Sequence, residues 1–194
     1  MTGNSGTKFS KQKLNHTLKK IVELLHLYKI DNWFIGYGTL LGIVRENSCI
    51  DNDDDIDLII DRQHSSNVKT LLSENGFHLT SYELHISESE DFLKTIDTDD
   101  LCIVDFYCAT VDKNGNFHDK WEKVIWSNCY IDKKKKKLIE IEWEETKLYL
   151  PNLYESKLTN RYGPNWRVPQ DKRGDHVPFR RYRPHGRSSL KRIL

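Results

Sequence analysis

The sequence has few of the residues that mark fibrous, low-complexity or membrane-embedded proteins. Its 194 residues include only 10 glycines and 5 prolines, which excludes a collagenous or low-complexity composition. Its longest apolar runs are only a few residues long and its N-terminus is polar, so neither a membrane span nor a secretory signal is expected, and we predict a cytoplasmic protein. Hydrophobic residues make up 37% of the chain, which is enough to bury one core, so we expect one globular domain.

The sequence also lacks an excess of charge of one sign. Lys and Arg number 30 and Asp and Glu number 29, so the formal net charge of +1 gives no whole-molecule field for gathering a polyanion. The charges are nevertheless segregated. Residues 44–62 carry seven acids, whereas residues 161–194 carry ten Lys or Arg against two acids. An acidic middle and a basic tail are therefore separate features of the chain.

Cysteine motifs are missing as well. The four cysteines show neither the CxxC nor the CxxxxH spacing of a structural zinc site, and three of them lie in strand-like apolar stretches. We therefore expect buried free thiols, which fits a reducing compartment.

The spacing of apolar residues predicts an α/β (α+β) fold in which helices flank a small mixed sheet. Helices are expected over residues 10–28 with Ser10 as the N-cap, 40–45, 65–74 and 152–162. Strands are expected over residues 33–35, 56–60, 77–86, 101–111, 124–131 and 138–143. We expect a flexible N-terminus over 1–9, one folded domain over 10–170 and a loosely packed or disordered basic tail over 171–194.

Residues 51–57 hold the densest chemical signal, with five aspartates followed directly by three apolar residues. One interpretation is a solvated acidic loop. A calcium loop is disfavoured because Ile56 stands where the turn needs Gly and Arg62 stands where calcium needs a bidentate Glu. The third interpretation is a magnesium site. On a strand, Asp55 and Asp57 project from one face about 7 Å apart, close enough to converge on one or two ions.

Two further features extend the magnesium interpretation. Asp105 is the single acid in the apolar stretch 101–107, and a buried acid needs a cation, either a metal ion or an Arg. Upstream, Gly36-Tyr37-Gly38-Thr39 offers backbone amides and a hydroxyl at the start of a helix, which is the geometry that holds a phosphate. A phosphate cradle, an acid pair and a third acid on another strand together describe a nucleotidyltransferase-type site.

Several of these stretches resemble the LicD/fukutin family. The signature-like segments are GTLLGIVR over 38–45 and DDDIDL over 53–58, followed by the single-acid strand around Asp105 and a YG-x-x-W-x-x-P segment over 162–169. The resemblance spans about residues 14 to 170 and implies a nucleotidyltransferase-like catalytic domain. It also implies a metal-dependent transferase that moves a phospho-alcohol, such as phosphocholine or ribitol phosphate, from a CDP-linked donor to a glycan hydroxyl.

The resemblance and the acid pattern together assign roles to individual residues. The expected catalytic residues and ligands of Mg²⁺ or Mn²⁺ are Asp55, Asp57 and Asp105, with Asp53 as a further candidate ligand. The expected substrate-binding residues are Gly38, Thr39 and Arg45. Asp105 is expected either to bind the metal or to take the acceptor proton, and Arg45 either to pair with an aspartate or to contact donor phosphate.

Other functions stay open at this point. The same site could perform nucleotidyl transfer to a sugar phosphate or another small acceptor. The basic tail interleaves Arg with Phe179, Tyr182 and His185, a composition that also suits a non-catalytic nucleic-acid-binding module. Strand carboxylates would repel nucleic acid, so we do not expect it as the partner. The run Lys133–Lys137 is expected to be a solvated hairpin tip, with an anionic partner as the alternative.

Overall fold

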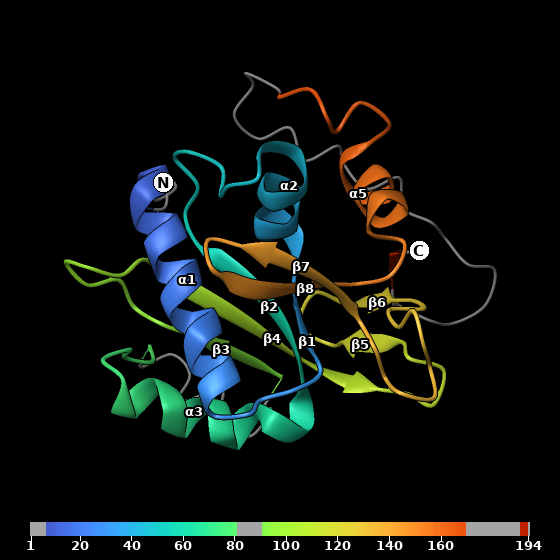
Figure 1. The fold of residues 1–194 in the computed structure, drawn as a ribbon, viewed down its shortest axis with the longest axis horizontal. Coiled ribbons are helices and arrows are strands. Elements are labelled where there is room, and N and C mark those ends of the chain that lie inside the picture. Colours follow the sequence, from blue (N-terminus) through green and yellow to red (C-terminus); the bar gives the residue numbers. More distant parts are fainter. Residues whose placement is uncertain (1–6, 81–90, 170–190, 194) are drawn as a thin grey trace, which may run out of the picture.

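The computed structural model describes residues 7–80, 91–169 and 191–193, which form a curled mixed sheet with helices packed around it (Figure 1). The helices are α1 (Lys11–Leu27), α2 (Tyr37–Glu46), the 3-10 turn η1 (Arg62–His64), α3 (Ser65–Glu74) and α5 (Tyr154–Tyr162). The strands are β1 (Trp33–Ile35), β2 (Ile56–Asp61), β3 (Phe92–Lys94), β4 (Val104–Val111), β5 (Phe117–Asp119), β6 (Val124–Trp126), β7 (Ile139–Trp143), β8 (Thr146–Leu150) and β9 (Lys191–Ile193). In these ranges we find no helix with the length and apolar character needed to cross a bilayer.

The sheet is built around the parallel pair β2 and β4. Its strand order is β1-β2-β4-β5-β6-β9, with β3 pairing with β4, and β1 and β3 run antiparallel to their neighbours. Parallel neighbours need a crossover connection, which η1, α3 and the chain leading to β3 provide. Strands β7 and β8 form a separate hairpin that packs on β1 and α1 in front of the sheet (Figure 1).

The predicted amphipathic pattern accounts for how α1 packs. The buried positions of this helix follow spacings of three and four residues, and they are Leu14, Thr17, Leu18, Ile21, Val22 and Leu25. The hydroxyl of Ser10 accepts a hydrogen bond from the Lys13 amide at 3.3 Å, so the predicted N-cap is confirmed. Strand β2 is buried along its whole length, as expected for a strand with neighbours on both sides.

A backbone clasp joins the start of the chain to the acidic loop. The Phe9 amide donates to the Asp53 carbonyl at 2.9 Å and the Asn52 amide donates to the Phe9 carbonyl at 3.0 Å. The Asp51 carboxylate accepts from the Lys11 amide at 2.9 Å. The Phe9 side chain, which precedes the expected domain boundary at residue 10, is buried in the core. The clasp therefore holds the acidic loop against the N-terminal end of α1.

Many predicted elements are confirmed, and some boundaries are corrected. The strand at 33–35, the helix at 65–74, the helix ending at 162 and the strand over 138–143 agree with β1, α3, α5 and β7 within one or two residues. Helix α2 begins at Tyr37 and not at residue 40, with Gly36 as its N-cap, so most of the predicted glycine turn is the first turn of the helix. The strand expected over 101–111 begins only at Val104.

The largest differences concern short strands. Of the strand expected over 77–86, residues 81–86 lie outside the described residues, and Leu79 makes a single bridge with Thr95. The strand expected over 124–131 ends at Trp126, because the amides of Cys129 and Ile131 bond to the carbonyls of Gly115 and Lys137 and not to a ladder partner. Strands β3, β5 and β8 were not predicted.

The cysteines and the C-terminal tail were also predicted from the sequence. All four cysteines, Cys49, Cys102, Cys108 and Cys129, are buried free thiols, as predicted. Most of the expected tail, residues 170–190, lies outside the described residues. Its end is not irregular: β9 pairs with β6 in parallel.

Candidate active site

The register of β2 and β4 brings two of the predicted acids together. Asp57 on β2 lies opposite Asp105 on β4, so their side chains project from the same face of neighbouring strands about 5 Å apart. Both residues are buried. Asp55 comes two residues before Asp57 and shares its face. The three acids predicted to be catalytic therefore converge at the start of β2.

The N-terminus of α2 holds Asp57 in place. The Gly38 amide donates to Asp57 Oδ2 at 2.9 Å, and the Asp57 amide donates to Thr39 Oγ1 at 2.8 Å. The positive end of the helix therefore faces a carboxylate, which it stabilises as it would a phosphate. A Cβ at position 38 would lie 2.9 Å from Asp53 Oδ2 and 3.4 Å from Asp57 Oδ2. A larger residue at this position would push the Asp53 carboxylate away from its present place.

A lysine that the sequence analysis missed supplies a cation to the site. Lys94 lies opposite Asp105 in the β3–β4 register, and its Nζ is 2.8 and 2.9 Å from the two Asp105 carboxylate oxygens. The same Nζ is 4.0 Å from Asp55 Oδ2. The sequence predicted that Asp105 pairs with a metal ion or an Arg. In the structure it forms an ion pair with Lys94.

One cation does not balance the buried acids. Burial, followed by repulsion from neighbouring carboxylates, raises the pKa of Asp55 and of Asp57 well above the ordinary value. Burial also raises the pKa of Asp105, although the Lys94 charge opposes that rise, and burial raises the pKa of Asp53. The site therefore favours either bound protons or an additional cation.

The carboxylates at the outer edge of the site have the arrangement that a cation needs. Oxygens of Asp53, Asp54 and Asp55 all lie within 4.8 Å of one another, and hard divalent cations prefer such oxygen ligands. This cluster contains the predicted ligands Asp53 and Asp55 and adds Asp54, which was not predicted. Asp57 and Asp105 lie deeper, and their oxygens accept hydrogen bonds from groups of the fold.

Aromatic and cationic side chains border the acids on one side. The Tyr107 hydroxyl donates to Asp57 Oδ1 at 3.2 Å, and the Tyr37 hydroxyl donates to buried Asp119 at 2.7 Å. The Arg161 guanidinium, from the last turn of α5, lies 4.3 Å from the centre of the Tyr37 ring. Burial raises the pKa of Asp57, and the Arg161 charge opposes that rise. In the sequence, Arg161 was counted with the basic C-terminal residues. In the structure, its guanidinium instead lies beside the acids, on the Tyr37 ring.

The three predicted substrate-binding residues separate in the structure. Gly38 and Thr39 lie against the acids, but the Thr39 side chain is buried and its hydroxyl accepts the Asp57 amide. Arg45 lies in the last turn of α2, at the end away from Asp57, where its Nε donates to Glu46 at 2.8 Å. It pairs with a glutamate of its own helix and not with an aspartate. Phosphate binding by these three residues stays a prediction.

Comparison with known proteins points to one family. A model of the LicD/FKTN/FKRP nucleotidyltransferase domain matches residues 31–153, a range that contains every acid of the site described above. No curated protein matches the chain significantly.

Two solved structures show weak overall similarity. The lincomycin-bound lincosamide antibiotic adenylyltransferase LnuA is 14% identical, with a TM-score of 0.49 over 75% of this chain and 82% of that chain. A Thermotoga maritima protein assigned as a nucleotidyltransferase is 15% identical, with a TM-score of 0.42 over 79% of this chain and 85% of that chain.

Proposed function

Because the chain belongs to the LicD/FKTN/FKRP nucleotidyltransferase-domain family, we propose that it moves a phospho-alcohol from a CDP-linked donor to a glycan hydroxyl. Membership of this family makes the chain a transferase domain. The finer assignment is supported by one observation above all, the convergence of buried carboxylates at the N-terminus of α2. We assign the activity to residues 10–170.

Different residues of the chain would bind a cation and accept a proton. Asp53, Asp54 and Asp55 would hold Mg²⁺ or Mn²⁺, with Asp57 fixed beside them by the Gly38 amide. A bound Mg²⁺ supplies positive charge that offsets the negative charge of a donor diphosphate. The cluster fits such an ion because its ligand atoms are carboxylate oxygens and its buried acids are short of positive charge.

Asp105 is suited to act as the general base. The transfer breaks the bond between the phospho-alcohol phosphorus and the CMP oxygen and forms a bond from that phosphorus to the acceptor oxygen. The proton of the acceptor hydroxyl goes to an Asp105 carboxylate oxygen. Burial raises the pKa of this carboxyl, which makes it more basic than an ordinary carboxylate, and Lys94 holds both of its oxygens in place.

An aromatic row beside the acids suits the nucleoside part of the donor. Tyr37 contacts Tyr107, with ring centres 4.7 Å apart, and Phe92 contacts Tyr107 at 5.2 Å. The half-buried Trp121 stacks on Phe92 at 4.4 Å with an angle of 7°. Tyr37, Tyr107 and Phe92 are buried, so within this row the half-buried Trp121 is the ring that leaves area for a planar base, and Arg161 places a positive charge next to Tyr37.

The experiment is to incubate the protein with each of a panel of donors and to identify the products by mass. The panel contains CDP-choline, CDP-ribitol, other nucleoside-diphosphate alcohols, and CTP with sugar phosphates. Release of CMP from a CDP-linked donor supports the proposal. Pyrophosphate from CTP would instead show nucleotidyl transfer, the alternative chemistry for the same site. Asp57→Asn and Asp105→Asn should abolish turnover, whereas Asp99→Asn, the same change at an exposed acid, should not. Equal activity in all these variants would refute the site assignment.

A further inference from the structure

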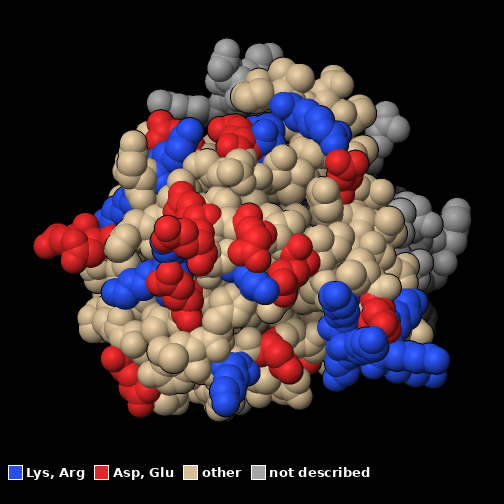
Figure 2. Space-filling model, viewed as in Figure 1, with Lys and Arg blue, Asp and Glu red and all other residues tan. Residues whose placement is uncertain are grey.

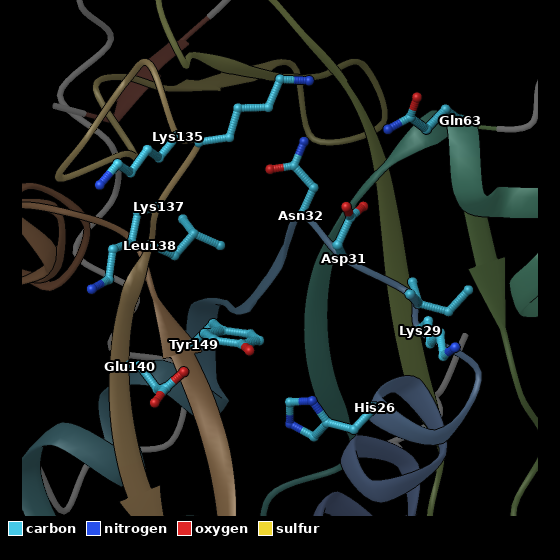
Figure 3. Close-up of a pocket in the computed structure, with 12 residues that line it drawn as sticks. His26, Lys29, Asp31, Asn32, Gln63, Lys135, Lys137, Leu138, Glu140 and Tyr149 are labelled. Atoms are coloured by element: carbon cyan, nitrogen blue, oxygen red, sulfur yellow. The ribbon is translucent and has the colours of Figure 1, made fainter.

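A cavity at the other end of β2 is not used by the proposed function. Strand β2 begins next to Asp57 and ends at Asp61, where the chain turns into η1. There, a cavity of about 670 Å³ lies between the C-terminal end of α1, the loop at 29–32 and the lysine-rich loop before β7 (Figure 3). A second, separate cavity of about 550 Å³ borders it, and both are lined by Gln63 and Lys136.

The positive charge around the first cavity is not compensated. Its lining includes Lys29 on one side and Lys135 and Lys137 on the other (Figure 3). Lys136 also lines it. Within the described part of the chain, these four ammonium groups have no ion-pair partner. In the space-filling view, basic side chains gather at the lower right of the molecule, over the loop that leads into β7 (Figure 2).

The two acids of the same lining already have partners outside it. Asp31 Oδ1 lies 2.6 Å from His64 Nε2, and Glu140 Oε1 lies 2.8 Å from Lys147 Nζ. Neither His64 nor Lys147 lines the cavity. The acids are therefore engaged elsewhere, and the cavity keeps an excess of positive charge.

The loop that carries three of the lysines has a defined shape. Its ends are joined by a bridge between Asp132 and Lys137, and the Asp132 carboxylate accepts from the amides of Lys134 and Lys135 at 3.0 and 3.2 Å. The turn is the predicted hairpin tip. Its backbone is fixed, and Lys135, Lys136 and Lys137 line the cavity, whereas Lys133 and Lys134 do not.

The chemistry of the lining selects the class of ligand. Lysine binds phosphate as a point charge, and no arginine lines this cavity for bidentate contacts. The lining rings of His26 and Tyr149 pack edge to face on each other and on buried Trp33, so they are engaged in the core and not arranged to stack on a base. The volume is that of a small-molecule site. We propose that this cavity binds a compact ligand that carries several phosphate groups.

The test is calorimetric titration of the whole chain with inorganic tripolyphosphate in EDTA, which removes metal-dependent binding at the carboxylate site. Two variants carry the same charge change in the same loop. Lys135→Gln/Lys136→Gln should weaken binding about tenfold or more, the scale of losing a hydrogen bond to a charged group, whereas Lys133→Gln/Lys134→Gln should change it less than about twofold. Wild-type affinity should fall with added salt.

Three results would overturn the proposal. The first is the absence of saturable tripolyphosphate binding. The second is that both double variants weaken tripolyphosphate binding equally. The third is that single-stranded RNA binds more tightly than tripolyphosphate and that both double variants weaken RNA binding equally. Orthophosphate should bind much more weakly than tripolyphosphate. Asp57→Asn should leave tripolyphosphate binding unchanged, so this proposal and the proposed transferase activity can fail independently.

Discussion

Removal of the Lys94 ammonium should destabilise the folded protein in a way that depends on pH. The Nζ atom bonds both oxygens of Asp105 at 2.8 and 2.9 Å, and the Asp105 side chain is only 7% exposed. In Lys94→Met, the stem still packs on the sheet, but the Asp105 carboxylate is left beside Asp55 and Asp57 without its cation. The variant therefore measures what that positive charge contributes.

The expected magnitude follows from the burial of the pair. Removing one partner of a buried ion pair costs about 3–5 kcal/mol, because the other charge stays buried and uncompensated. The Lys94 side chain is 33% exposed, so water screens part of the interaction. We expect a loss of about 2–3 kcal/mol at neutral pH, which for a domain of this size lowers Tm by about 4–12 °C.

The pH dependence has a definite sign. The pKa of Asp105 is already raised in the folded state by burial, against the effect of Lys94, and removing Lys94 raises it further. Over the range between the unfolded pKa near 4 and the raised folded value, the folded variant binds more protons than the unfolded chain, so its stability falls as pH rises. The difference between variant and wild type should therefore be large at pH 7 and shrink toward pH 4.

The assay is thermal and urea unfolding of both proteins in EDTA at several pH values, followed by addition of Mg²⁺. A divalent cation replaces the missing positive charge, so the variant should gain more stability from Mg²⁺ than wild type does. The matched control is Lys147→Met, which removes an ion pair of the same 2.8 Å length at the surface and should leave Tm unchanged. A loss in Lys94→Met that is as large at pH 4 as at pH 7 would refute the electrostatic account.

Further outcomes follow from the same site. Without metal, the Tm of wild type should fall as pH rises from about 5 to 8, because burial and repulsion raise the folded pKa of Asp55 and Asp57. Mg²⁺ should make Tm less dependent on pH. A metal-free Tm that does not change with pH would contradict the description of Asp55 and Asp57 as buried acids. Tyr37→Phe removes the 2.7 Å bond to fully buried Asp119 and should cost about 1–3 kcal/mol in urea unfolding, whereas Tyr28→Phe, which loses a bond to exposed Glu74, should cost less. Thr39→Val should lose about 1–2 kcal/mol of unfolding free energy because it removes the acceptor of the Asp57 amide, whereas Thr39→Ser keeps the hydroxyl and should keep the stability; if Thr39→Val instead keeps full stability and weakens donor binding while Thr39→Ser binds donor normally, Thr39 holds phosphate as first predicted.

Elements with a strong local pattern could be read from the sequence. Helix α3 has the predicted bounds because its apolar positions and Gly76 mark both the face and the end. Strands β1 and β2 stand out as apolar runs, and an acid in an apolar run needs a partner wherever the strand lies. The prediction that Asp55, Asp57 and Asp105 lie at one site therefore followed from composition, spacing and family resemblance together.

Features that depend on pairing between segments distant in the sequence could not be predicted from it. Lys94 lies on a strand of three residues, too short to show alternation, and only the β3–β4 register places it on Asp105. Arg161 lies in a helix that the sequence does predict, but only the tertiary packing of α5 places its guanidinium on the Tyr37 ring beside the acids. At Thr39 the sequence showed only a helix start that suits phosphate; that its hydroxyl also accepts the Asp57 amide depends on a tertiary contact.

The clasp between Phe9 and the acidic loop has a consequence for how tightly the site can hold an ion. A loop that is ordered only when a cation arrives loses conformational entropy at that moment, and the loss is subtracted from the affinity. Here the backbone at Asn52 and Asp53 is already fixed by hydrogen bonds to Phe9. The loop is therefore ordered when the domain folds. The N-terminal segment, remote in sequence from most of the site's carboxylates, thus holds Asp53 in position before any cation binds.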